Sequence, residues 1–334
     1  MVFARRFNSE RVRDAHLTCL TGMPRRVFCS AALFRVIVLD KTRSRNITRG
    51  VWRLSSALTD SKIRQDSVGC GADSLAKAAL MPGALTFHLL PDIPLIAAGD
   101  DLGVILHASI ARAGLTLADG DVLVLAQKIV SKAEGRLIPL ASVTASQRAV
   151  ELAAETDKDP RLVQLILDES TEVMRKRAGV LIVRHRLGNV GAHAGIDQSN
   201  IEHDGGEAAL LLPVDPDASA QALHDQLRRI TGQRLAIIIA DSMNRAWRMG
   251  TIGGAIGCAG FKVLDDLRGT HDLFGRELKV TIINRADSLA AAACLLMGES
   301  VQRTPAVLIQ GLPFESTTQT ARDIIRPLAD DMFR

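Results

Sequence analysis

The chain has 334 residues, of which 47% are hydrophobic, 23% are charged and only 3% are aromatic. This composition is typical of a globular protein, so it excludes a wholly disordered chain and a collagen-like repeat. A chain of this length can bury real cores and predicts about two domains.

The net charge of +4 is unevenly distributed along the chain. Residues 1–80 hold 15 Lys and Arg against 6 Asp and Glu, whereas the remainder holds 26 against 31. Because the remainder is acidic, a body that binds polyanions is disfavoured and no nucleic-acid partner is expected. We interpret residues 1–80 as a basic extension, either disordered or the result of an over-called start, so that the working protein begins near Met81.

The five cysteines are an odd number, and none lies in a CxxC pair. They indicate neither a disulfide framework nor a zinc ribbon, which favours a reducing, cytoplasmic location. No apolar run reaches the roughly 18 residues that a membrane span requires, so no membrane partner is expected.

Beyond Met81, strand-like and helix-like patterns alternate, which predicts an α/β or α+β fold for residues 81–330 with two interleaved α/β subdomains. Helices are expected where a capping residue precedes a helical period and glycine ends it: after Asp100 and Asp101, from Asp159 to Gly179, at 219–230 and at 288–297. Strands are expected at the short apolar runs 122–126, 180–183, 235–240, 278–283 and 306–309.

Common nucleotide-binding signatures are missing from the sequence. It contains neither GxxxxGK(S/T) nor a GxGxxG placed after a strand, so neither a P-loop nor a Rossmann turn is predicted. The glycine-rich segment 250–260 has helix-like spacing. It predicts either close helix packing or a floor where a planar ligand or a partner chain approaches the backbone.

Two polar segments are candidate metal sites. Asp241 and Ser242 directly follow the apolar run 235–240, at the end of a strand where open sheets bind ligands and where hard cations find oxygen donors. A helix cap or a turn explains the same residues. Asp197 and Asn200 are explained equally well by an Asx turn or by a carboxylate and an amide that face a metal-nucleotide complex.

Charged residues after the strand 122–126 are candidate phosphate ligands. Ser131, Lys132 and Arg136 could hold a polyphosphate, with lysine as a point charge and arginine as a bidentate fork. A solvated charged loop is the alternative. Glu299, which follows Gly298, would ordinarily be an exposed loop acid.

Taken together, these segments occur in the order and spacing of one known family. Over about residues 88–312 the chain resembles the coenzyme F420-0:γ-glutamyl ligases. The motifs that carry the resemblance are Pro94-Leu95-Ile96, Gly99-Asp100-Asp101-Leu102, Ser131 to Arg136, Gly195-Ile196-Asp197, Asp241-Ser242, Trp247-Arg248-Met249-Gly250-Thr251 and Leu264-Asp265-Asp266-Leu267-Arg268-Gly269.

The resemblance implies a two-domain mixed-sheet fold and a GTP-dependent ligase. Such an enzyme joins L-glutamate to the carboxylate of coenzyme F420-0 through an acyl phosphate, and further γ-linked glutamates are an option. It also implies two divalent ions, Mg²⁺ or Mn²⁺, with K⁺ as a helper, and a homodimer. By matching motifs, the metals fall on Asp197, Asp241, Ser242 and Glu299. The GTP contacts fall on Ile93, Pro94, Leu95, Ile96, Ser131, Lys132, Arg136, Asn200, Met297, Gly298, Ser300 and Thr304.

Several positions depart from the family pattern, among them Met243-Asn244, Ala246 and Val301-Gln302-Arg303. They leave a second hypothesis open, a paralogous metal-GTP ligase that acts on another carboxylate acceptor. A third hypothesis is a regulatory binder whose basic extension engages nucleic acid. His193, His203 and Trp247 also stay open. Each histidine is either a ligand or base or an ordinary residue, and the tryptophan either stacks on the deazaflavin or lies in the core.

Overall fold

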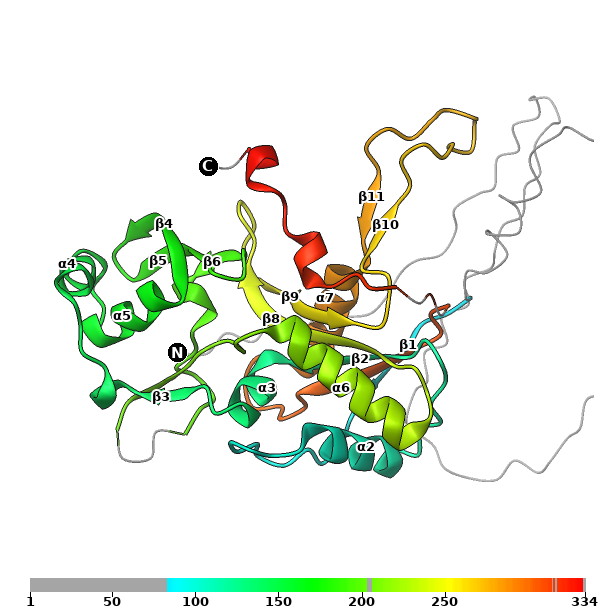
Figure 1. Ribbon diagram of the computed structural model, residues 1–334, viewed down its shortest axis with the longest axis horizontal. Coiled ribbons are helices and arrows are strands. Elements are labelled where there is room, and N and C mark those ends of the chain that lie inside the picture. Colours follow the sequence, from blue (N-terminus) through cyan, green and yellow to red (C-terminus); the bar gives the residue numbers. More distant parts are fainter. Residues whose placement is uncertain (1–82, 203–205, 314, 316, 333–334) are drawn as a thin grey trace, which may run out of the picture. The chain divides into compact units, whose positions relative to one another are not determined.

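The computed structural model describes residues 83–202, 206–313, 315 and 317–332, so the predicted extension 1–80 lies outside the described residues (Figure 1). The body is built on a five-stranded sheet in the order β1-β12-β2-β8-β9. Only β2 and β8 are parallel neighbours, which makes the sheet mixed, as predicted. Its strands are β1 (Thr86–Leu89), β12 (Ala306–Gln310), β2 (Val122–Ala126), β8 (Ala236–Asn244) and β9 (Thr251–Ala259).

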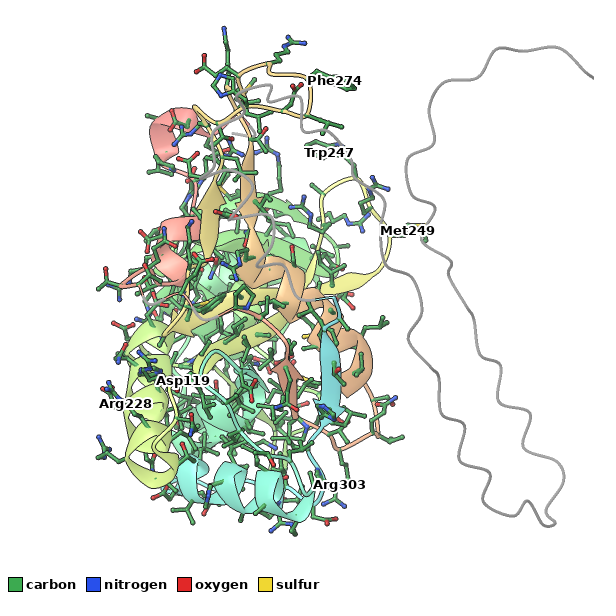
Figure 2. The ribbon with its side chains drawn as sticks, turned by 90° about the vertical axis from the view of Figure 1, so that its right-hand side faces the viewer. Asp119, Arg228, Trp247, Met249, Phe274 and Arg303 are labelled. Carbon is green, nitrogen blue, oxygen red and sulfur yellow. The ribbon has the colours of Figure 1, made fainter. Side chains whose placement is uncertain are left out.

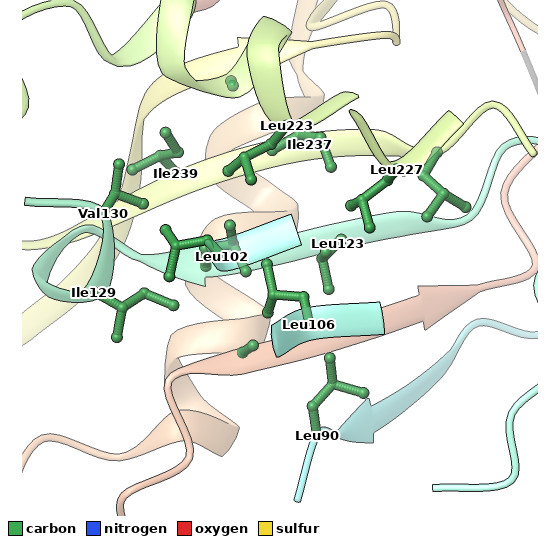
Figure 3. Packing of buried hydrophobic residues seen from close by; sticks show 14 of the residues in the cluster. Leu90, Leu102, Leu106, Leu123, Ile129, Val130, Leu223, Leu227, Ile237 and Ile239 are labelled. Carbon is green, nitrogen blue, oxygen red and sulfur yellow. The ribbon is translucent and has the colours of Figure 1, made fainter. Parts of the chain in front are cut away.

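Helices cover both faces of this sheet because successive strand residues point to opposite sides. On one face Leu123 and Leu125 pack with the apolar sides of α2 (Leu102–Arg112), α3 (Gln127–Ala133) and α6 (Pro216–Thr231), as Figure 3 shows. On the other face Val122 and Val124 pack with α7 (Arg285–Met297). A strand buried on both faces must be apolar throughout, which explains the continuous run of the sequence.

A third hydrophobic cluster lies in the segment between α3 and α6. Here α4 (Gln147–Thr156) and α5 (Pro160–Asp168) pack on an antiparallel sheet of β4 (Ser170–Arg177), β5 (Val180–His185) and β6 (Val190–Ala192). The strands β3 (Leu137–Pro139) and β7 (Ala208–Leu210) pair at the base of this segment. Two further strands, β10 (Leu264–Asp266) and β11 (Ile282–Asn284), form a projecting arm (Figure 1). Short 3₁₀ helices are η1 (Leu140–Ser142), η2 (His193–Gly195), η3 (Ala321–Ile324) and η4 (Leu328–Asp330).

Most predicted elements are confirmed, but some boundaries were wrong. The helix expected from Asp159 to Gly179 ends at Asp168, and Val173 belongs to β4. At the end of the helix the Ser170 hydroxyl donates to the Ile166 carbonyl. The residues that follow pair with β5, and this pairing prevails over the helical spacing of the apolar residues. The strand expected at 278–283 is only Ile282–Asn284. No helix in the described part of the chain is long and apolar enough to cross a membrane.

The glycine-rich segment is the strand β9, so the helix suggested by its spacing was wrong. Its glycines do serve close packing. A Cβ on Gly253 would lie 2.5 Å from the carbonyl oxygen of Ala290 in α7, and one on Gly257 would lie 2.3 Å from that of Pro216 in α6. The glycines therefore let both helices approach the strand backbone.

Candidate functional site

Three chain segments meet at the carboxyl ends of the two parallel strands. Ala126 of β2 pairs with Ala240 of β8, so the residues that follow each, Gln127 and Asp241, lie at the same edge of the sheet. The loop before β12 reaches this edge too, because β12 runs antiparallel to β2. The amide of Ala126 donates to the carbonyl of Pro305 at 2.8 Å. The carboxyl edge of parallel strands is where open sheets bind ligands.

The strand β8 carries Asp241 and Ser242 at this edge. Its pairing with β9 shifts by one residue between Ile239 and Ala240, where Ile256 of β9 is the extra residue, and β8 then continues through Asp241 and Ser242 to Asn244. The expectation that Asp241 and Ser242 come after the strand, or form a helix cap or turn, was therefore wrong. The strand β2 ends at Ala126, whereas β8 continues to Asn244 because it stays paired with β9.

A cavity of about 500 Å³ opens at this edge. Its volume is in the range of small-molecule sites. Most of the predicted site residues line it: Ile93, Pro94, Leu95, Ile96, Lys132, Asn200, Asp241, Ser242, Met297, Gly298, Glu299, Ser300 and Thr304. Segments far apart in the sequence are thus brought together at one place.

Negative charge is concentrated on the β8 side of the cavity. Burial first, and then the nearby carboxylate of Asp197, raise the pKa of Asp241 to about 7. Glu299 adds to the effect, while Lys128 and the Ser242 amide oppose it. The Ser242 hydroxyl donates to Glu299 Oε1 at 2.5 Å. A cation placed here would relieve the mutual repulsion of the carboxylates.

Asp197 is not among the residues that line the cavity, but it lies close enough to Asp241 to raise its pKa, and side chains of α3 hold it. Its Oδ2 accepts from Gln127 Nε2 at 2.7 Å and lies 2.7 Å from Lys128 Nζ. Backbone hydrogen bonds with Leu210 fix the position of the residue. Ser131 is fully buried and donates to Gln127 Oε1 at 2.8 Å, so it orients Gln127 instead of lining the cavity.

The donor chemistry of this wall fits a hard divalent cation, because such ions take carboxylate and hydroxyl oxygens. Among the described residues, however, no three acidic, histidine or cysteine side chains already converge as ligands. These side chains already have partners within the chain, since Asp197 is engaged by Gln127 and Lys128, and Glu299 is engaged by Ser242. A bound metal would have to take over these contacts.

Positive charge faces the cavity from α3. Burial lowers the pKa of Lys132, whose ammonium donates to the Asn200 carbonyl at 3.1 Å. Arg136 is different, because its guanidinium donates to Glu169 at 2.8 Å and to the Leu212 carbonyl at 2.9 Å. The structure does not bring Arg136 to the cavity wall.

Several cavity residues were missed in the sequence, among them Glu202 and the pair Gln127 and Lys128. For the pair, the available signal was position, since they are the first polar residues after the buried strand 122–126. Trp247 is 83% exposed between β8 and β9, so the core alternative for it was wrong. His193 lies in η2, off the cavity wall, and His203 lies outside the described residues.

Comparison with known proteins gives a consistent result. The sequence profile described as F420-0:Gamma-glutamyl ligase matches residues 92–311. Proteins named coenzyme F420:L-glutamate ligase from Methanothermobacter thermautotrophicus and Methanopyrus kandleri are each 42% identical to the chain, over 72% and 76% of its length. The protein of that name from Methanocaldococcus jannaschii is 38% identical over 73%. The matches cover 96%, 100% and 94% of these relatives.

Proposed function

The chain belongs to the F420-0:gamma-glutamyl ligase family, and from this premise we propose that it joins L-glutamate to the carboxylate of coenzyme F420-0 with GTP as the energy source. The observation that carries the proposal is the cavity at the ends of β2 and β8, where carboxylates and lysines face each other across one space.

The reaction proceeds in two displacements. A carboxylate oxygen of F420-0 attacks the γ-phosphorus of GTP, GDP leaves, and an acyl phosphate forms. The amine of L-glutamate then attacks the acyl carbon, inorganic phosphate leaves, and the amide nitrogen loses a proton. Phosphoryl transfer depends on alignment and charge neutralisation, so no protein nucleophile is required.

Residues of the chain supply these requirements from both walls. Lys132 would contact the triphosphate, because it lines the cavity and its ammonium donates to a backbone carbonyl, that of Asn200. The Ile93 to Ile96 segment and the loop 297–304 would enclose the nucleotide. Asp197, Asp241, Ser242 and Glu299 would hold divalent cations, Mg²⁺ or Mn²⁺. When bound, two such ions neutralise and align the phosphate oxygens.

Four finer features are part of the same proposal: a K⁺ ion as helper, more than one added glutamate, a cytoplasmic location and a homodimer. The dimer is supported by apolar side chains on the arm and on the β8–β9 loop. Leu273 and Phe274 are 93% and 92% exposed, and Trp247 and Met249 lie along the same side in Figure 2. Large exposed apolar groups of this kind mark interaction surfaces.

The test is turnover of purified protein with F420-0, L-glutamate, GTP and Mn²⁺, followed by mass spectrometry. We expect the F420-0 mass to grow by one or more glutamyl units, with one GDP formed per amide and no gain without GTP. A panel of other carboxylic acids tests the second hypothesis, a paralogous ligase, which the departing loop Val301 to Arg303 on the cavity wall favours. Consumption of another acid while F420-0 is ignored would replace the first proposal with the second.

A further inference from the structure

Lys128 occupies an unexpected position for a cavity lysine. Its ammonium lies 2.7 Å from Asp197 Oδ2, and both side chains are about three-quarters buried, with 27% and 24% exposed. Asp197 is one of the carboxylates that would hold a divalent cation. A lysine therefore occupies a contact that the metal needs.

The two side chains that hold Asp197 differ in freedom. Gln127 is 1% exposed and is fixed through its own oxygen by the hydroxyl of Ser131, so its amide is a rigid donor. Lys128 lines the cavity and carries its charge on a flexible four-carbon stem. No other hydrogen bond or ion pair holds its ammonium among the contacts of the described residues. Of the two, only Lys128 can move away without breaking a buried network.

The contact between Lys128 and Asp197 offsets the negative charge around it. Asp197 and Glu299 both act on Asp241, while Lys128 is the one positive side chain that offsets them there. Without a cation, the neighbouring carboxylates of Asp197, Asp241 and Glu299 would repel one another in a partly buried place, which is costly. The side-chain ammonium of Lys128 reduces that cost as long as no external cation is bound.

We propose that Lys128 is a displaceable counter-ion that occupies the place of the divalent cation on Asp197. The arriving cation takes the carboxylate, and the released ammonium turns into the cavity, where it can meet the phosphate oxygens of the substrate. This inference rests on the proposed function, because it assumes that Asp197 binds metal. No covalent bond is made or broken in the exchange.

The proposal is tested by Mn²⁺ binding to the metal-free full chain at fixed pH without nucleotide, with free Mn²⁺ followed by electron paramagnetic resonance. Lys128→Met removes the competing charge while keeping the stem, so Mn²⁺ should bind roughly fivefold more tightly, as expected for loss of a partly exposed ion pair. Lys128→Gln gives a second neutral variant in case the first fails to fold. Lys128→Arg keeps the charge and should bind like the wild type.

Lys132→Met is the matched control, because Lys132 lies one turn further along α3 and contacts the Asn200 carbonyl instead of Asp197. Its Mn²⁺ affinity should change by less than about twofold, since its charge is not on the ligand. A purely structural ion pair would destabilise both states alike and leave Mn²⁺ affinity unchanged.

The outcomes separate the inference from its premise. If the wild type binds Mn²⁺ but the neutral Lys128 variants bind it no more tightly, or no more tightly than Lys132→Met, the counter-ion role is wrong and the metal site stands. If the wild type binds no Mn²⁺ at all, the metal assignment falls and the counter-ion role falls with it.

Discussion

Two partly buried carboxylates of this protein are treated in opposite ways. Burial opposes the ionisation of Glu169, yet contacts from His185, Arg186 and Arg136 outweigh it and hold the pKa of Glu169 at about 2. Asp241 faces other carboxylates, and its pKa rises to about 7. The first carboxylate is satisfied by the protein alone, and the second is not.

The difference separates a structural acid from a functional one. The guanidinium groups of Arg136 and Arg186 lie 2.8 Å and 2.9 Å from the oxygens of Glu169, and His185 Nε2 lies 3.3 Å away, so two arginines neutralise the charge of this carboxylate. At Asp241 the chain gathers negative charge and leaves open space beside it. Such an arrangement costs stability, and strongly perturbed groups in a cleft mark functional sites.

The largest effect is expected from Asp241→Asn. Under the proposed function, loss of this carboxylate should reduce the rate of glutamyl ligation more than 100-fold, because it would remove a ligand of the divalent cation that aligns the phosphates. Initial rates with F420-0, GTP, L-glutamate and Mn²⁺ measure the loss. Asp266→Asn on β10, whose carboxylate binds Arg268, is the control and should keep normal rates. A normal rate in Asp241→Asn would show that Asp241 has no role in the reaction.

The satisfied carboxylate should matter for folding instead. Glu169→Gln leaves two arginines of a buried cluster without their shared anion, so the free energy of unfolding should fall by about 3 kcal/mol. Urea denaturation measures it. Glu151→Gln is the matched control, because Glu151 is exposed and accepts only from Gln147. A change of less than about 0.5 kcal/mol in Glu169→Gln would show that the cluster is not stabilising.

The pH dependence of stability should differ in sign between the two groups. Between the unfolded pKa of about 4 and the folded pKa of about 7, folded Asp241 keeps its proton longer than the unfolded chain does, so stability falls as pH rises. The contribution of Glu169 is complete above about pH 4.3 and is lost as pH falls toward 2. Relative to the wild type in EDTA, Asp241→Asn should therefore gain about 3 kcal/mol from pH 4 to pH 7. A difference that stays constant with pH would refute the raised pKa.

The smallest effect is expected from a change of Lys132 on α3, which lines the cavity. Lys132→Ala should raise the Kd for GTP about tenfold, because one phosphate-facing charge is lost. Isothermal titration measures the affinity. Lys176→Ala, which removes a lysine paired with Glu155 on the surface, should leave it unchanged. Equal affinities for the wild type and Lys132→Ala would exclude the phosphate role.

Much of the fold could be predicted because its signals are local. The run 122–126 is apolar throughout since β2 is buried on both faces, and Gly232 and Gly298 end α6 and α7 through backbone conformations that favour glycine. The end of α5 could not be predicted, because the pairing of Ser170–Arg177 with β5 depends on contacts made by the next strand. The glycines of β9 likewise suggested a helix because sequence spacing does not show which element lies opposite.

The site was predicted where residue type and position agree. Asp241 and Lys132 are polar residues just past apolar runs, and both line the cavity. Arg136 has the same chemical character, yet its partner Glu169 is 33 positions away and removes it from the wall. Lys128 was missed for the converse reason, since only the structure shows that its ammonium lies on Asp197.

The most direct measurement is the position of manganese in crystals of the protein grown with Mn²⁺ and a non-hydrolysable GTP analogue, located by anomalous scattering at the manganese edge. We expect anomalous density bounded by Asp241, Ser242 and Glu299 on one side and Asp197 on the other, with the Lys128 ammonium displaced from Asp197. Anomalous density elsewhere would contradict the assignment of Asp241 as a ligand of the cation. Bound nucleotide with Asp197 still held by Gln127 and Lys128, and Glu299 still held by Ser242, would contradict it as well.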